Sequence, residues 1–449
     1  MKAKRAAVVA IISAFCLLFS SCGSGSFIRP VSSLISPPLY YEEYEELVKA
    51  FNENVGSDAI LCSPGKGDYR SAIIVEDVDS DGEDDALIFY KTVSDKTTAR
   101  MQFFQTVDGR WISRNDFSGY GNGVESVTVT DMDGDGNCEI IVNWNTSGVS
   151  SGNVMSLYRT SGSADRYKEI LNEMCSVSEV IDIDGDGAQE LFFISQSNAS
   201  GVNQRTASAM RLSGDTVVLM GETKVDPNIS SYVSVKTEKV SGDAPMRIYV
   251  DALKGESMMI TELIFWDDAK SLLLAPLLDE KTLSNAATVR YEPIPCADIN
   301  NDGIIDIPVQ SVLFGKGDDT STIDSEVVYL TSWTDYDDSG SRVVANTLIN
   351  SEDGYMIYLD DSEINTTGIR NYRSQSCWVV YRTDGSGKSV GEIYSVLKIS
   401  KERWNPESFS AYIPISENDD GVVCVYITQN GKDSGIDEEY VKSKITDLP

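Results

Sequence analysis

The chain has 449 residues, enough for two or three domains with sizeable cores. Its formal net charge of −33 argues against a nucleic-acid partner, because phosphate binding requires clustered Lys and Arg. It contains no histidine, which excludes a Ser/His/Asp triad, His-ligated zinc and imidazole acid–base catalysis.

The N-terminus has the pattern of a secretory signal. Cations at positions 2, 4 and 5 precede an apolar stretch over 6–19 that is too short to span a bilayer comfortably. The sequence Phe-Ser-Ser-Cys over 19–22 resembles a bacterial lipoprotein processing site, in which the cysteine becomes the lipidated first residue. Residues 1–22 therefore predict a protein anchored through Cys22 to the extracellular face of the bacterial cell membrane. An ordinary secretory signal and an N-terminal anchor helix are the alternatives.

Residues 23–39 are rich in Gly, Ser and Pro and predict a linker. Residues 40–56 predict an amphipathic helix that packs on the domain following it. The apolar face of this helix would consist of Tyr40, Tyr44, Leu47 and Phe51. Residues 58–64 predict a strand that closes a ring of sheets.

An acidic stretch occurs four times, over 75–90, 129–144, 180–195 and 296–311. The first aspartates are Asp77, Asp131, Asp182 and Asp298, which lie 54, 51 and 116 residues apart. Because the last gap is about twice the others, we expect a degenerate copy over 234–253 that has lost its acidic residues. Such a fixed period indicates one supersecondary unit copied about five times.

Each unit contains four short β-branched and aromatic runs bounded by turn residues. In the second unit the acidic turn separates SVTVTD from EIIVNW, and NVMSLYRT and RYKEILN follow. Four strands per repeat is typical of a β-propeller blade. We therefore predict a mainly β protein with a propeller of about five blades over 57–350, with six or seven blades as alternatives.

The acidic turns predict metal-binding loops, because alternate side chains on a tight loop can converge on one hard cation. Counted from the first aspartate, position 6 is always glycine, at Gly82, Gly136, Gly187 and Gly303. The candidate ligands at positions 1, 3, 5, 7 and 9 are Asp77, Asp79, Asp81, Glu83 and Asp85 in the first loop; Asp131, Asp133, Asp135, Asn137 and Glu139 in the second; Asp182, Asp184, Asp186, Ala188 and Glu190 in the third; and Asp298, Asn300, Asp302, Ile304 and Asp306 in the fourth. Position 7 varies, so we expect it to contribute its backbone carbonyl.

An EF-hand or a dockerin would require an acid at position 12 and a helix afterwards. Position 12 is instead apolar in every copy, at Ile88, Val142, Phe193 and Val309. Pro308 also argues against a helix after the fourth loop. Each loop is therefore expected to join two strands.

These four stretches resemble the FG-GAP (VCBS-type) repeat of integrin α-chain propellers and of many secreted bacterial proteins. The resemblance covers roughly 70–350 and implies calcium bound between the first two strands of a blade. Residues 353–449 predict a small α+β domain, with an additional blade as the alternative. This segment is similar to a small C-terminal module of clostridial-type lipoproteins.

Six cysteines remain outside the signal, at Cys62, Cys138, Cys175, Cys296, Cys377 and Cys424. They are too sparse for a disulfide scaffold, and no CxxC pair occurs, so we expect small buried apolar side chains.

The predicted rim opposite the metal loops collects long Ser-, Asn- and Gly-rich connections over 144–153, 195–206 and 311–326, with Trp144 and Arg205 among them. This rim is the predicted surface for a glycan or protein partner. We predict a calcium-stabilised, non-enzymatic binding or scaffold protein with no catalytic residues. A polysaccharide hydrolase or lyase that uses propeller carboxylates is the alternative.

Overall fold

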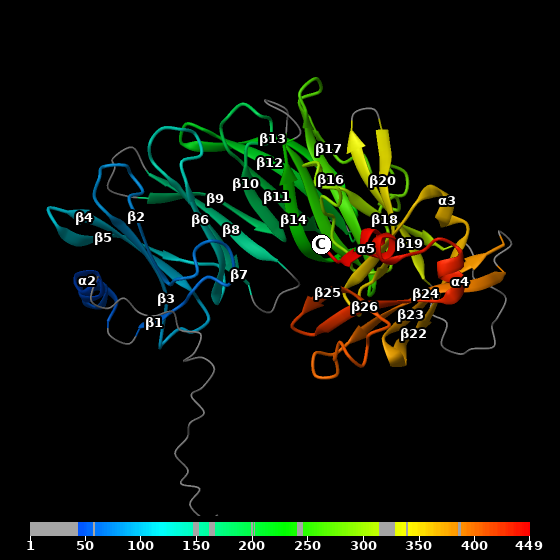
Figure 1. Cartoon of the computed structure of the whole chain (residues 1–449). Helices are drawn as coiled ribbons and strands as arrows, with labels where there is room; N and C mark the ends of the chain where they lie inside the picture. The colour runs from blue at the N-terminus through cyan, green and yellow to red at the C-terminus, as the bar shows by residue number, and fades with distance from the viewer. Residues whose placement is uncertain are drawn as a thin grey trace, which may run out of the picture.

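The computed structural model shows a mainly β protein, whose described residues form six antiparallel sheets that follow one another along the chain (Figure 1). It describes residues 44–56, 59–146, 152–160, 167–198, 201, 203–239, 246–313, 328–337, 340–384 and 388–449. The sheets succeed one another along an arc that begins beside helix α2 (Glu45–Val55).

The first sheet contains β1 (Ala59–Leu61), β2 (Ile73–Glu76), β3 (Asp85–Thr92), β4 (Arg100–Val107) and β5 (Arg110–Ser118). The second contains β6 (Gly123–Thr130), β7 (Glu139–Asn145), β8 (Asn153–Thr160) and β9 (Tyr167–Cys175). The third contains β10 (Val177–Ile181), β11 (Glu190–Ser197), β12 (Gln204–Ser213) and β13 (Thr216–Val225). The fourth contains β14 (Ile229–Glu238), β15 (Arg247–Lys254), β16 (Met258–Asp267) and β17 (Leu272–Leu274).

The fifth sheet contains β18 (Ile307–Val312), β19 (Tyr329–Asp337), β20 (Gly340–Asn350), β21 (Tyr355–Leu359) and β27 (Ile445–Asp447). The sixth contains β22 (Thr367–Tyr372), β23 (Cys377–Thr383), β24 (Ser389–Ile399), β25 (Ile413–Asn418) and β26 (Gly421–Ile427). The short helices are α3 (Asp361–Ile364), η3 (Arg373–Gln375), α4 (Gln429–Asp433) and α5 (Glu438–Lys444).

The second and third sheets confirm the predicted four-strand unit. Their strands pair in chain order, β6-β7-β8-β9 and β10-β11-β12-β13, and an acidic loop joins the first two strands of each. The degenerate copy near 237 also forms strands, β14 and β15, which pair with each other. Residues 240–245 between them lie outside the described residues.

The apolar runs after the first three acidic loops are buried along most of their length because both faces are covered, by neighbouring sheets or, on the first sheet, by α2. In β3 and β7 the first six residues are all buried. Phe89 and Trp144 pack edge to face between the first and second sheets, with ring centroids 6.1 Å apart. Further buried clusters join the second sheet to the third and the third to the fourth. A strand buried on both faces reads as a continuous apolar run, as these sequences do.

Local segments cover the two ends of the series. On the first sheet, Leu47 and Phe51 of α2 pack against Ile88 and Tyr90. On the sixth, Trp404 and its neighbours cover Ile399, Val422 and Cys424. The described residues form no core cluster between the first and sixth sheets. Strand β1 pairs with β3 and so extends the first sheet, where sequence analysis expected a strand that closes a ring.

The C-terminal segment shares a sheet with the repeat region. Strand β21 pairs with β20, and β27 near the chain terminus pairs with β21. The domain boundary predicted near 353 therefore falls within the fifth sheet. A shared core extends from that sheet into the sixth, where Leu348 and Tyr355 belong to the same cluster as Val396.

The six cysteines outside the signal are all unpaired, and four of them are buried. The predicted signal over 1–22, the linker over 23–39 and Tyr40 lie outside the described residues. In the part of the chain that the structure describes, no helix is long and apolar enough to cross a membrane.

Truncating Leu47 tests the packing of α2 on the first sheet. Leu47 is fully buried, so Leu47→Ala should lower the free energy of unfolding by about 2–5 kcal/mol. Glu53 lies on the exposed face of the same helix, so Glu53→Ala should change it by less than about 0.5 kcal/mol. Denaturant melts measure both variants. Equal stability of Leu47→Ala and wild type would mean that the helix does not pack as described.

Candidate metal centres and the inner cavity

The four acidic loops share one backbone conformation. Position 6 is a glycine with positive φ in every loop, between +87° and +95°. Position 4 also has positive φ, at Ser80, Gly134, Gly185 and Asn301. A left-handed residue at both positions curls the loop tightly, and only position 6 was predicted.

Backbone N–H groups hold the loop carboxylates in place. In the first loop Gly82 N–H donates to Asp77 at 3.0 Å, and Glu83 N–H donates to Asp81 at 2.8 Å. In every loop the N–H of position 2 donates to the acid at position 9, as Val78 does to Asp85 at 3.2 Å. These bonds orient the carboxylates before any ion binds. The N–H of position 7 donates to the side chain of position 5 in every loop. That the carbonyl of position 7 binds a metal ion stays a prediction.

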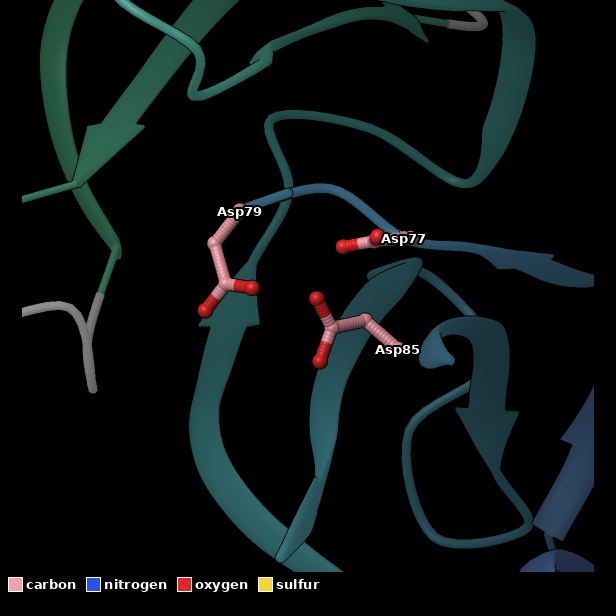
Figure 2. Close-up of side chains that lie close together, drawn as sticks. All are labelled: Asp77, Asp79 and Asp85. Atoms are coloured by element: carbon pink, nitrogen blue, oxygen red, sulfur yellow. The ribbon is translucent and has the colours of Figure 1, made fainter. Parts of the chain in front are cut away.

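Three loops bring acidic oxygens together closely enough to hold a metal ion. The residues are Asp77, Asp79 and Asp85; Asp131, Asp133 and Glu139; and Asp182, Asp184 and Glu190. Within each group, one oxygen of every residue lies within 4.8 Å of the others. Figure 2 shows the first group, whose three carboxylates point toward a common space. Positions 1, 3 and 9 of these loops therefore converge as a hard-cation site requires.

The acid at position 9 lies deepest in each loop. Glu139, Glu190 and Asp306 are fully buried. One carboxylate oxygen of Glu190 and one of Asp306 make no hydrogen bond, whereas the corresponding oxygen of Glu139 lies 3.1 Å from the guanidinium of Arg159. Burial raises the pKa of Asp85, Glu139 and Glu190 to about 7, and repulsion from the other carboxylates of the loop adds to the shift. A buried carboxylate oxygen without a partner is costly, and a cation at the loop centre would satisfy it.

The fourth loop differs in its ligand set. Its hydrogen bonds match those of the other loops, including Ile299 N–H to Asp306 at 3.1 Å. Position 3 is Asn300, whose amide oxygen accepts from Asp302 N–H. No group of three acidic residues forms among its described side chains. The fourth loop therefore has the required backbone but fewer charged ligands.

The residue that lies across the sheet from position 9 was not among the predicted site residues. Asp85 pairs directly with Gln105 of β4. In the second sheet Ile140 pairs with Tyr158, so the same register places Arg159 of β8 opposite Glu139. In the third sheet Leu191 pairs with Met210, so it places Arg211 of β12 opposite Glu190. All three side chains reach acidic groups of their loop. Their position opposite the loop follows from the strand register and not from the sequence spacing, because they lie far from the loop in the sequence.

An inner cavity of about 570 Å³ opens where the first strands of three successive sheets face one another. Its wall comes from 66–69, β6, β10 with the two residues before it, and β14, together with residues of β7 and β8. The polar side chains on the wall include Lys66, Asp68, Tyr69, Ser126, Thr128, Asn143, Ser178, Glu179 and Ser234. Burial by the wall raises the pKa of Glu179, although its side chain is exposed to the cavity, and the charge of Lys66 opposes this shift.

The structure corrects the ligand rim that the sequence predicted. Trp144 is fully buried and packs in the core between the first and second sheets, so it is not part of a ligand surface. Arg205 is also buried and donates to the Ile229 carbonyl at 2.8 Å. Most of 311–326 lies outside the described residues. Both side chains were placed on the surface because they flank polar loops, but they belong to strands.

No model of a known protein family matches the sequence, and a search of curated proteins returned no match. Among solved structures, the chain is similar to the Bacillus licheniformis rhamnogalacturonan lyase PL11, with 12% identity and a TM-score of 0.31 over 74% of this chain and 76% of that one. It is also similar to the exotype rhamnogalacturonan lyase YesX, with 10% identity and a TM-score of 0.30 over 74% of this chain and 75% of that one. A third structure is Sqt1 from Chaetomium thermophilum, with 8% identity and a TM-score of 0.30 over 78% of this chain and 94% of that one.

The prediction that the protein is not an enzyme is contradicted by this comparison, which returns polysaccharide lyases. The prediction rested on the absence of histidine and on the apparent lack of acids outside the metal loops. The cavity shows that acids do occur outside the metal loops, because Asp68 and Glu179 line it and neither belongs to a metal loop.

The raised pKa values of the position 9 acids predict a pH-dependent stability. Between about pH 4.5 and 7 the unfolded chain loses protons that folded, metal-free Asp85, Glu139 and Glu190 retain, so stability should fall as pH rises. Each group should contribute about 1 kcal/mol or more. A bound divalent cation requires the deprotonated acids, so its stabilisation should grow over the same interval.

Thermal melts at pH 5, 6, 7 and 8, with chelator or with calcium chloride, measure this effect. We expect the two series of midpoints to diverge as pH rises. Parallel series would show that these carboxylates do not meet a cation.

Proposed function

We propose that the protein is a calcium-stabilised β-propeller-type protein that binds a polysaccharide in the inner cavity and cleaves it as a hydrolase or lyase. The observation that carries the proposal is the cavity itself, where Lys66, Asp68, Tyr69 and Glu179 line a concave polar wall outside the metal loops. A concave polar wall suits hydroxyl-rich chains better than the apolar core of a protein interface.

Calcium is the ion we propose for the loops. Their ligands are carboxylate and amide oxygens, which suit calcium, magnesium or manganese, and the described chain offers no cluster of cysteines for a softer metal. The flexible coordination of calcium fits a loop whose ligand set changes from copy to copy. At ten times its Kd, one calcium ion would stabilise the fold by about 1.4 kcal/mol.

The loops and the cavity share the same strands. The first loop follows β2, the second follows β6 and the third follows β10, and residues 126–129 and 177–180 of the latter two line the cavity. A cation in each loop would hold the end of the inner strand against its neighbour. Its role in our proposal is therefore to keep the cavity wall in register.

The chemistry of the wall fits glycosidic cleavage. Glu179 has a raised pKa, so it can exchange a proton nearer neutral pH than an ordinary carboxyl. Asp68 supplies a second carboxylate on the same wall, and a hydrolase requires such a pair. Lys66 supplies a cation that can pair with an acidic sugar, and a lyase must remove the proton next to a sugar carboxyl group.

We also propose a location for this activity, based on Cys22 in the predicted signal. Lipidation of Cys22 would hold the protein at the extracellular face of the bacterial membrane, with 23–39 as the tether. Extracellular calcium and polysaccharide would then both be available to it.

Replacing Glu179 tests the cleavage. Incubation of the calcium-loaded protein with a panel of acidic and neutral polysaccharides should release new reducing ends from at least one. Glu179→Gln should slow this release about 10²–10⁴-fold, the usual contribution of a general acid or base, while binding persists. Glu222 is exposed on β13, away from the cavity wall, so Glu222→Gln should cleave at the wild-type rate. Equal losses in both variants, or no cleavage of any polysaccharide, would refute the proposed activity.

Replacing Cys22 tests the anchor. In bacteria that process lipoproteins, the wild-type protein should partition with membranes, and Cys22→Ser should abolish lipidation and release the protein or leave its signal uncleaved. Detergent phase partitioning and mass measurement of the mature N-terminus distinguish these results. An unmodified Cys22 in the mature wild-type protein would contradict the prediction.

A further inference from the structure

The four loops differ in the charge that faces their acids from the neighbouring strand. This residue is Gln105 for the first loop, Arg159 for the second, Arg211 for the third and Asp335 for the fourth. Gln105 is neutral, the two arginines are cationic, and Asp335 is anionic. Loops with nearly the same ligands therefore start from different local charges.

Arg159 contacts three acids of the second loop at once. Its guanidinium lies 2.8 Å from Asp133, 2.7 Å from Asp135 and 3.1 Å from Glu139. These are positions 3, 5 and 9, most of the set that a bound calcium ion would use. The Arg159 side chain is only 8% exposed, so its charge is held inside the loop. A guanidinium remains protonated in proteins, so this charge is permanent.

The first and third loops lack such an internal cation. Gln105 is neutral and donates a hydrogen bond to Asp79 at 2.7 Å. In the third loop Arg211 is 39% exposed and lies 2.8 Å from Asp184 and 3.7 Å from Asp186, and Lys239 is 36% exposed and lies 3.4 Å from Asp182. These cations contact positions 1, 3 and 5 from the solvent side. The buried oxygen of Glu190 therefore still lacks a hydrogen-bond partner. In both loops the deepest acid remains available to a metal ion.

We infer that Arg159 takes the place of calcium in the second loop, so that this loop is neutralised by the protein itself while the first and third loops bind the ion. The inference rests on the proposal that the loops bind calcium. It makes the residue opposite position 9 the determinant of which loops are filled. The second loop then stays folded when external calcium is scarce.

Isothermal titration of calcium into the chelator-stripped full chain tests the inference. Arg159→Gln gives the second loop the residue that the first loop has, and it should bind one more calcium ion per chain than wild type. Asp133→Asn in the wild-type background should leave the number unchanged, whereas Asp79→Asn in the first loop should lower it by one. The Asp133→Asn comparison does not depend on Arg159→Gln folding.

The outcomes separate this inference from the proposed function. If Arg159→Gln binds no additional ion, Arg159 is not what keeps calcium out of the second loop, and if Asp133→Asn loses one, that loop already holds calcium. Either result overturns the inference while calcium binding itself stands. If wild type binds no calcium and Asp79→Asn changes nothing, the calcium proposal fails and the inference fails with it.

Discussion

Mutual repulsion among carboxylates is the constraint on which the repeat region depends. Each loop gathers several acids at the end of a β-hairpin, and the acid at position 9 is buried against the sheet. Water cannot fully solvate these groups, and the N–H groups of the loop satisfy only some of their oxygens. A positive charge at the centre resolves the repulsion. In the second loop the protein supplies one through Arg159, and in the first and third we propose calcium.

This constraint links the loops to the architecture. Acidic loops join β2 to β3, β6 to β7 and β10 to β11, and the apolar strand after each loop is buried in the core. Loops that are held closed therefore hold the innermost strands in position. Two of those strands, β6 and β10, form part of the wall of the cavity, so the ion sites and the proposed polysaccharide site share one frame. The cavity acids are distinct from the loop acids, and each set can have its own function.

Much of this organisation could be predicted from local sequence. The alternation of acids, glycine at position 6 and apolar residues afterwards depends on neighbours within about a dozen residues, so loops and strands were predictable. Position 4 was missed because Ser80 and Asn301 adopt left-handed φ without being glycine. Arg159 and Gln105 were missed because strand register, not sequence spacing, brings them to the loops. Trp144 was misplaced because a residue at the end of a strand can face the core or the loop surface, and only packing decides which.

Crystals grown with calcium would test the central claim most directly. The account predicts a strong electron-density peak between Asp77, Asp79 and Asp85, with oxygen distances of about 2.3–2.6 Å, and a second peak in the third loop. It predicts the Arg159 guanidinium, without such a peak, in the second loop. Carboxylates that point apart in the first and third loops, with only water between them, would contradict it.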